Sequence, residues 1–220
     1  MPTSVWLRPE RAAVGRPARR SRSEITAAAV AVADRDGAEA VSMRRVAAEL
    51  GTGAGTLYRY VETRDELLDL MADHVTGEYA FAAPTGDWLE DLVATALQAR
   101  DIHRRHPWLA DRVLTAPGTG PHGADLVEHH LAVLAEHPAD DGAKLVALGV
   151  LSALVATFAR AEHAGRDLER NAEYMAHVAA AGTHPHISAL DAPPPDPAHD
   201  PLPDVLRRVL TGLLPIDSGS

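Results

Sequence analysis

The chain has 220 residues, of which 46% are hydrophobic and 24% charged, as is typical of a globular protein of one or two domains. It has no cysteine, which excludes disulfide frameworks, cysteine–zinc sites and thiol nucleophiles. The net charge of −10 is uneven, because residues 1–64 hold 11 Arg against 7 Asp and Glu, a net +4, and residues 65–220 hold −14. A basic N-terminal third indicates that one end meets a polyanion, although a solvated basic tail gives the same asymmetry.

Membrane and secretory segments are not expected. No apolar run reaches about 18 residues, so the sequence predicts no spanning helix. The Arg-rich start lacks the apolar region of a secretory signal. Together with the missing cysteines, these features predict a cytoplasmic protein without membrane contacts.

The first elements are an arm and a helix. Residues 1–20 are polar and Arg-containing without periodicity, so we expect a flexible basic N-terminal arm. Ser21 and Glu24 have the spacing of a capping box, and an apolar stripe of helical period follows them. Gly37 marks the end of this predicted helix.

Two short predicted helices come next, separated by glycine. Ser42 can cap a helix that ends at Gly51, and a second helix runs from about Ala54 to Tyr60. Ala47 lies where the two would cross, so that they can approach closely. This pattern predicts a helix-turn-helix, whose second helix lies in a DNA major groove. A helical hairpin with surface tyrosines is the alternative.

The rest of the chain also has helical periodicity. Thr63 and Glu66 form another capping box at the start of a helix to about Phe81. No strand is expected, and the prediction is an all-α protein with a three-helix DNA-binding domain at residues 21–66 and a larger helical domain at residues 67–220. The further predicted helices cover about 88–106, 108–114, 124–137, 144–164, 168–182 and 203–214, and the proline-rich residues 182–203 are expected to form a loop.

The stretch GTGAGTLYRY, residues 51–60, suits contact with DNA. Two of the four tyrosines of the chain flank Arg59 here. Glycine and alanine let the backbone approach phosphates or base edges, and tyrosine hydroxyls donate to phosphate oxygens. An arginine can pair with phosphate or with guanine.

The block VSMRRVAAELGTGAGTLYRYVETRDELLDLMADHV resembles the DNA-binding domain of the tetracycline-repressor family of bacterial regulators. The matches are A-A-E-L-G at 47–51, T-L-Y at 56–58 and T-R-D-E-L-L at 63–68. The rest of the chain is most similar to the tetracycline-repressor subgroup. The resemblance implies a homodimeric repressor, not an enzyme, that occupies a palindromic double-stranded operator and releases it when a small molecule binds.

The family pattern also implies roles for single residues. Arg44 matches a position that reads a guanine, and its neighbour Arg45 could share that role. Gly53 replaces the usual polar cap of the recognition helix, and Arg64 replaces a phosphate-binding Lys. The residues implied in DNA binding are Arg19, Arg20, Ser42, Met43, Arg44, Gly53, Ala54, Gly55, Thr56, Tyr58, Arg59, Tyr60 and Arg64.

The same resemblance gives expectations for the ligand. In an ungapped alignment with the tetracycline repressor, Val113 takes the place of a metal-binding histidine, so no magnesium–tetracycline chelate, metal or other cofactor is expected. A bulky, hydrophobic inducer and regulation of an exporter gene are implied instead. The expected pocket residues are Tyr79, Thr95, Ala99, Val113, His130 and Phe158.

The sequence leaves open which surface forms the dimer and whether the protein binds DNA at all. The leucine and valine stripes at 143–163 and 203–214 suggest dimer faces, although packing within one subunit would use the same stripes. An all-α carrier or an enzyme without DNA function is the competing class. The basic first third argues against the carrier. No catalytic motif supports the enzyme, and the twelve histidines show no metal-binding spacing.

Overall fold

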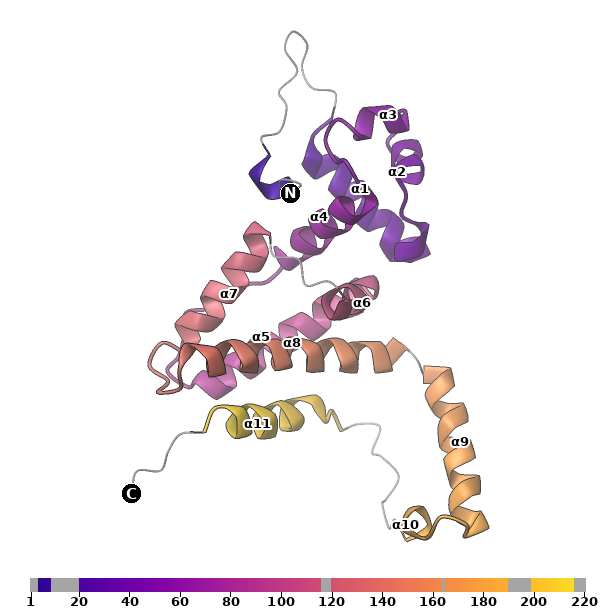
Figure 1. Ribbon diagram of the computed structural model, residues 1–220, viewed down its shortest axis with the longest axis vertical. Coiled ribbons are helices and arrows are strands. Elements are labelled where there is room, and N and C mark those ends of the chain that lie inside the picture. The colour runs from indigo at the N-terminus through magenta and orange to yellow at the C-terminus, as the bar shows by residue number, and fades with distance from the viewer. Residues whose placement is uncertain (1–3, 9–19, 116–119, 164, 190–198, 216–220) are drawn as a thin grey trace.

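The computed structural model describes residues 4–8, 20–115, 120–163, 165–189 and 199–215, and every regular element in these ranges is a helix (Figure 1). The all-α prediction is therefore confirmed. The elements are η1 (Val5–Leu7), α1 (Arg22–Asp36), η2 (Ala38–Ala40), α2 (Met43–Glu49), α3 (Ala54–Leu57), α4 (Arg64–Thr76), α5 (Trp88–Arg105), α6 (Trp108–Thr115), α7 (Pro121–Val133), α8 (Asp141–His163), α9 (Gly165–Ala181), α10 (Pro185–Ser188) and α11 (Leu202–Leu213).

Local sequence signals set the ends of the first helices. Ser21 and Glu24 form the predicted capping box of α1, and Gly37 follows the helix at a φ of 84°, a conformation that favours glycine. Ser42 and Thr63 accept hydrogen bonds from backbone amides at the starts of α2 and α4. The caps at Ser21 and Ser42 are as predicted, but the box predicted at Thr63 is only half formed, because the Glu66 carboxylate accepts from the amide of Glu62 and not from that of Thr63.

Helices α1 to α4 form a small head around one core. Ile25, Val46, Leu57, Leu67 and Met71 are all fully buried in it. The same cluster also includes buried side chains of α5 and α6, which are Ile102, Trp108 and Leu109. The head therefore packs directly onto the second part of the chain.

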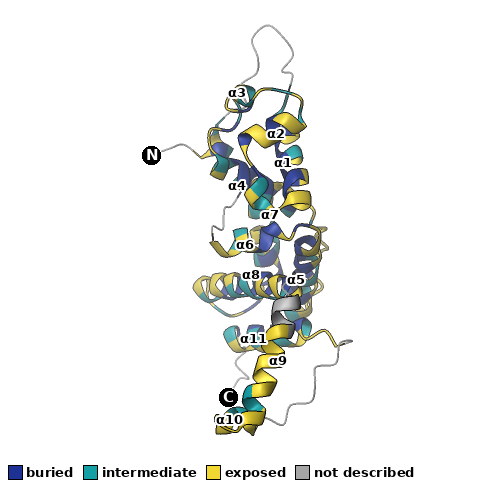
Figure 2. Ribbon diagram, turned by 90° about the vertical axis from the view of Figure 1, so that its right-hand side faces the viewer, coloured by how far each residue is buried: buried dark blue, intermediate teal, exposed yellow. Residues whose placement is uncertain are grey.

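The second part is a bundle in which α5, α8 and α11 share a core (Figure 1). The leucine stripe of α11 is fully buried there, at Leu202, Leu206, Leu210 and Leu214. The prediction of a dimer face on this stripe is therefore wrong, because its partner is the subunit's own bundle. Helices α9 and α10 extend away from the bundle and are mostly exposed (Figure 2).

Several predicted ends shift. Helix α4 stops at Thr76, not near Phe81, because its last amides close a turn at Gly77. Helix α7 begins at Pro121, before its predicted start at about 124, since proline suits the first helical turn. The short helix α10 lies in the proline-rich region, of which residues 190–198 lie outside the described residues.

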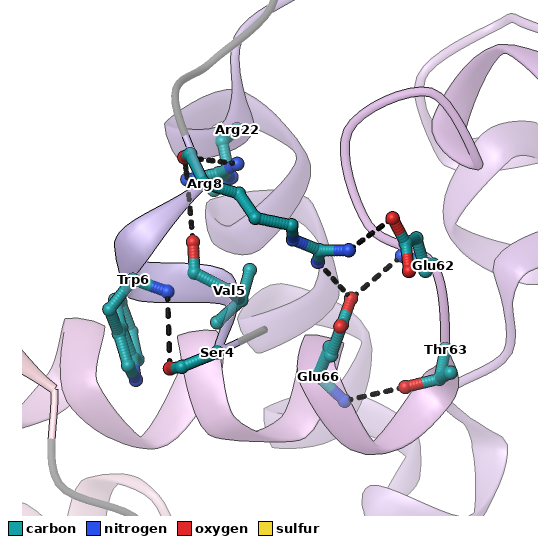
Figure 3. A network of polar contacts seen from close by, with 8 residues as sticks. All are labelled: Ser4, Val5, Trp6, Arg8, Arg22, Glu62, Thr63 and Glu66. Carbon is teal, nitrogen blue, oxygen red and sulfur yellow. Dashed lines mark hydrogen bonds and ion pairs between the residues drawn. The ribbon is translucent and has the colours of Figure 1, made fainter. Parts of the chain in front are cut away.

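The N-terminal arm differs from the prediction at residues 4–8, which we call the clip. Val5 is only 3% exposed in the core of the head, and Ser4 caps the turn η1. The Arg8 guanidinium pairs with the carboxylates of Glu62 and Glu66, and Arg22 donates to the carbonyls of Val5 and Arg8 (Figure 3). The clip is thus docked on α1 and on the start of α4, and the prediction of a flexible arm is wrong for these residues.

The clip also contacts the start of α7. A Cβ atom on Gly120 would lie 2.6 Å from Cζ2 of Trp6 and 2.4 Å from the carboxyl of Asp73. The φ of Gly120 is −97°, so space, not backbone strain, requires glycine here. Asp73 is buried and accepts a hydrogen bond of 3.0 Å from the amide of Gly123. The clip, α4 and α7 therefore meet in close contact.

The clip can be tested by Arg8→Ala. We expect the free energy of unfolding to fall by about 1 kcal/mol, because the two carboxylates lose their cation and the docked turn loses its anchor. Urea titration at low salt measures this. The matched control is Arg104→Ala, whose half-exposed side chain also pairs with two carboxylates, those of Asp101 and Glu162. Equal losses in the two variants would contradict a special role for Arg8.

Candidate functional site

The helix-turn-helix is built from α2, a glycine turn and α3. Gly51 has a φ of 62°, which favours glycine, and the amide of Thr52 donates to the carbonyl of Ala47 at 2.9 Å. Ala47 is 1% exposed, as expected where two helices cross, and Leu57 anchors α3 in the core. This leaves the other side of α3 on the surface of the head (Figure 1).

The predicted DNA-contacting residues of α3 lie on that surface. Gly53, Gly55, Tyr58 and Arg59 are exposed, Tyr58 at 53%, and Ala54, Thr56 and Tyr60 are half-buried. A Cβ at Gly53 or Gly55 would meet no atom within 4 Å, so packing within the chain does not require glycine at either position. Glycine leaves open space there, which suits the close approach of a DNA backbone.

Two arginines of the head have no partner among the described residues. Among the arginines of the described residues up to position 64, Arg44 and Arg59 alone make no hydrogen bond or ion pair with another described residue. Arg45, the other candidate for base reading, pairs with Asp36 at 2.9 Å. The geometry therefore favours Arg44 over Arg45 as the reader of a base.

Two other residues predicted to contact DNA, Arg64 and Arg20, instead make hydrogen bonds within the head. Arg64 donates to the carbonyls of Val41 and Ala38, at 2.9 and 2.8 Å, and so holds the segment before α2. Arg20 donates to the carbonyl of Leu50, at the end of α2. Arg19 lies outside the described residues.

Ser42 and Met43 stand at the start of α2. Ser42 is exposed and caps the helix, whereas the side chain of Met43 is buried in the core of the head. The side chain of Met43 is therefore not available for contact with DNA.

A second candidate site is a cavity among α5, α7 and α8. Its volume is about 20 Å³. Four of the six predicted ligand residues converge on it, namely Tyr79, Thr95, Ala99 and His130. The sequence did not single out the other lining residues, which are Ala96, Leu126, Leu151, Ser152 and Val155.

The other two predicted residues lie elsewhere. Val113 is on α6 and packs against the core of the head and the small cluster of Ala110, Ala156 and Ala159. Phe158 packs on the core of the bundle without lining the cavity. Helical spacing of Leu151, Ser152 and Val155 was a usable signal for one lining face of α8, once the neighbours of α8 are known.

The cavity is uncharged. None of its lining residues is Asp, Glu, Lys or Arg. His130 is 6% exposed, and its Nε2 atom is buried without a hydrogen-bond partner among the described residues. Burial and the neighbouring His129 lower the pKa of His130 to about 4, so the ring is neutral near pH 7. Burial also raises the pKa of the Tyr79 hydroxyl, which stays protonated.

A stack of rings lies between the cavity and solvent. The Tyr79 ring, which lines the cavity, stacks on Phe81 with centroids 5.7 Å apart. Phe81 in turn stacks on His129 of α7 at 4.7 Å, and its side chain is 41% exposed. Nε2 of His129 reaches Oγ1 of Thr95 on α5 at 3.4 Å. The stack therefore connects the segment after α4 with α5 and α7.

The head and the bundle also meet at a polar junction. His106 lies between Asp34 of α1 and Glu78, at 2.8 and 2.9 Å from its ring nitrogens, and Trp108 donates to Asp34 at 2.7 Å. Burial would raise the pKa of Glu78, but hydrogen bonds from Arg105 and His106 outweigh it and lower that pKa. A cleft of about 660 Å³ opens beside this junction, lined by Asp34, Asp36, Glu39, Asp111 and Arg160 among others.

No cluster of three or more histidine, aspartate or glutamate side chains within the described residues could hold a metal ion. The described histidines therefore act as single titratable groups.

Two of them predict a pH dependence of stability. The pKa values of His103 and His130 are both lowered to about 4, mainly by burial, against 6.5 for an exposed histidine. Between pH 6.5 and 4 the unfolded chain binds these protons and the folded chain does not, so the free energy of unfolding falls as the pH falls, by on the order of 3 kcal/mol for each histidine.

The variants His103→Leu and His130→Leu should each flatten this dependence. Urea titrations at several pH values measure it, and the exposed His186→Leu is the control. A slope between pH 6.5 and 4 that both variants leave unchanged would contradict the assignment.

Comparisons with known proteins agree with this geometry. Residues 25–71 match the family model of the bacterial regulatory proteins of the tetR family. Residues 80–199 match the tetracycline-repressor-like C-terminal domain. These two ranges cover most of the head and most of the bundle.

Two similar proteins are transcriptional regulators. The chain is 36% identical over 203 residues to the HTH-type transcriptional repressor DrrR1 of Streptomyces coeruleorubidus, covering 86% of this chain and 75% of that one. An HTH-type transcriptional regulator of Saccharopolyspora erythraea is 37% identical over 135 residues, which cover 61% of this chain and 57% of its own length.

Among solved structures, the TetR family protein ActR of Streptomyces coelicolor in complex with (S)-DNPA has a TM-score of 0.78 at 28% identity, covering 89% of this chain and 97% of that one. ActR in complex with actinorhodin has a TM-score of 0.75 at the same identity, over 89% and 96%. The chain belongs to the tetracycline-repressor family and is a DNA-binding transcriptional regulator, not an enzyme.

Proposed function

We propose that the protein is a ligand-responsive repressor that occupies a palindromic operator as a homodimer and releases it when a hydrophobic small molecule enters the cavity of α5, α7 and α8. The observation that carries this proposal is the position of α7. Leu126 and His130 of this helix line the cavity, and its first residues contact α4 and the clip. One helix thus joins the cavity to the head.

The contacts at the start of α7 support transmission of movement. The amide of Gly123 is bonded to Asp73 of α4, and a Cβ on Gly77, just after α4, would lie 3.2 Å from the ring of His122. Because α7 and the end of α4 are closely packed, a ligand that displaces α7 outward would also shift α4. A ligand that prefers the shifted state lowers operator affinity by its difference in binding free energy between the two states.

The homodimer would form on the exposed apolar surface of α8 and α9. The most apolar 18-residue window of α8 has a mean hydropathy of 1.9 and is only one-third buried, so by length and composition the helix could span a membrane. Here one face packs in the bundle, and Leu145 and Val146 are 55% and 59% exposed. Tyr174 and Met175 add exposed apolar surface on α9. Regulators of this family dimerise, and a second copy suits this surface.

The same family relationship supports a proposal for the inducer and for the target gene. ActR has been solved with small molecules bound, and DrrR1 is a named repressor. We infer that this protein responds to a bulky, largely apolar compound and acts in the cytoplasm on an exporter gene. The uncharged cavity supports the apolar inducer.

The proposed function is tested by binding to the DNA upstream of its own gene. A dimer that brings Arg59 and the basic arm of each subunit to phosphates should give a slope of log K against log salt on the order of −5, since each neutralised phosphate contributes roughly −0.9. Electrophoretic shifts or fluorescence anisotropy at several salt concentrations measure it. A slope near zero would exclude operator binding.

The role of Arg44 has its own test. Arg44→Ala should relax base preference at one symmetric pair of operator positions, at a cost of about 1–3 kcal/mol per half-site. The matched control is Arg45→Ala, because Arg45 is the adjacent arginine and is engaged with Asp36. Affinities for operators with single base-pair changes are compared. If Arg44→Ala weakens all of them equally, Arg44 contacts only phosphate.

A further inference from the structure

The clip holds the turn that follows α3. Arg8 pairs with the carboxylate of Glu62, in the turn between α3 and α4, and at 2.6 Å with that of Glu66, in the first turn of α4 (Figure 3). The Glu66 carboxylate also accepts a hydrogen bond of 2.8 Å from the amide of Glu62. One guanidinium therefore fixes the chain two residues after Tyr60, which is among the residues expected to contact DNA.

Helix α3 depends on such contacts because it is short. It has four residues, Ala54–Leu57, and its N-cap, Gly53, makes no side-chain hydrogen bond. A helix of one turn is not stable by itself in water, since nucleation of a helix is costly. Leu57 and Val61 are fully buried and hold α3 and the turn after it to the core. The contact at Glu62, the next residue, adds a fixed point outside the core.

The clip also touches the start of α7. Trp6 follows the buried Val5, and a Cβ on Gly120, the N-cap of α7, would lie 2.6 Å from Cζ2 of Trp6. Arg22 of α1 donates to the carbonyls of Val5 and Arg8, at 3.3 and 3.4 Å, on either side of Trp6 (Figure 3). The clip is thus held before and after the residue that meets α7.

We propose that Arg8 is a positioning residue for operator recognition, and that the clip is a second connection between α7 and α3, beside the one through Asp73 of α4. Arg8 fixes the direction of α3 through Glu62, and Trp6 makes that direction depend on where α7 begins. This inference rests on the proposed function, because it concerns how the same head recognises its operator. The competing explanation is that Arg8 only masks two carboxylates that would repel DNA.

The two explanations predict opposite effects of Glu62→Ala, which removes one negative charge from an exposed side chain. If Arg8 only masks charge, affinity for all DNA rises, because one carboxylate fewer repels the phosphates. If Arg8 positions α3, we expect affinity for the operator to fall roughly three- to tenfold, as for the loss of one charged hydrogen bond, while affinity for unrelated DNA does not fall.

The matched control is Glu49→Ala. Glu49 is also a part-exposed carboxylate of the head with an arginine partner, but that partner is Arg35 of α1, at 3.2 Å. The control removes the same charge and the same kind of pair without altering the clip. We expect it to leave the ratio of operator affinity to unrelated-DNA affinity unchanged.

The contact with α7 is tested by a double-mutant cycle of Trp6→Ala and Gly120→Ala, neither of which changes the charge. Gly120→Ala places a methyl group against Trp6 and should lower operator affinity less in the Trp6→Ala chain than in the unaltered one. Because the same methyl group also meets Asp73, only the part of its effect that Trp6→Ala removes belongs to the clip.

Fluorescence anisotropy of the full chain measures both affinities, with the DNA upstream of its gene and with an unrelated duplex of equal length. Equal effects of Gly120→Ala with and without Trp6 would overturn the connection to α7. No preference of the unaltered chain for the upstream DNA would overturn the proposed function and this inference with it. A clear preference that Glu62→Ala leaves unchanged or increases would overturn the positioning role of Arg8 alone.

Discussion

The structure depends on the packing of α4 against two partners at once. Its first turn carries Glu66, which holds Arg8, and its middle lies in the core of the head at Leu67 and Met71. Its last turn carries the buried Asp73, which holds the start of α7. Because a closely packed helix cannot shift at one end without disturbing the other, the head and the bundle are not independent. A regulator can use this constraint as a connection between its two sites.

The sequence predicted the parts that depend on local interactions. Caps at Ser21, Ser42 and Thr63 and the turn at Gly51 need only residues a few positions apart. The contacts of the clip could not be predicted in this way, since Arg8 and Glu66 are 58 positions apart. The stripe of α11 shows the same difficulty, because a leucine stripe specifies an apolar partner but not whether that partner is the same chain or a second copy.

The candidate sites show the difference between local and tertiary information. Four of the expected pocket residues, Tyr79, Thr95, Ala99 and His130, line one cavity, although they come from three separate segments. Val113 and Phe158 were expected there too and do not line it, because Val113 packs against the core of the head and Phe158 against the core of the bundle. For the head, the sequence could not say which arginines are already engaged. The structure shows that Arg45 is engaged with Asp36 and Arg64 with backbone carbonyls.

The burial of α11 has a consequence for how the protein is made. The core of the head uses residues between Val5 and Leu109, so it can form while the chain is still being synthesised. The core of the bundle needs Leu202 to Leu214, which are synthesised well after Leu109. In a nascent chain, the core of the head can therefore form before α11 completes the core of the bundle.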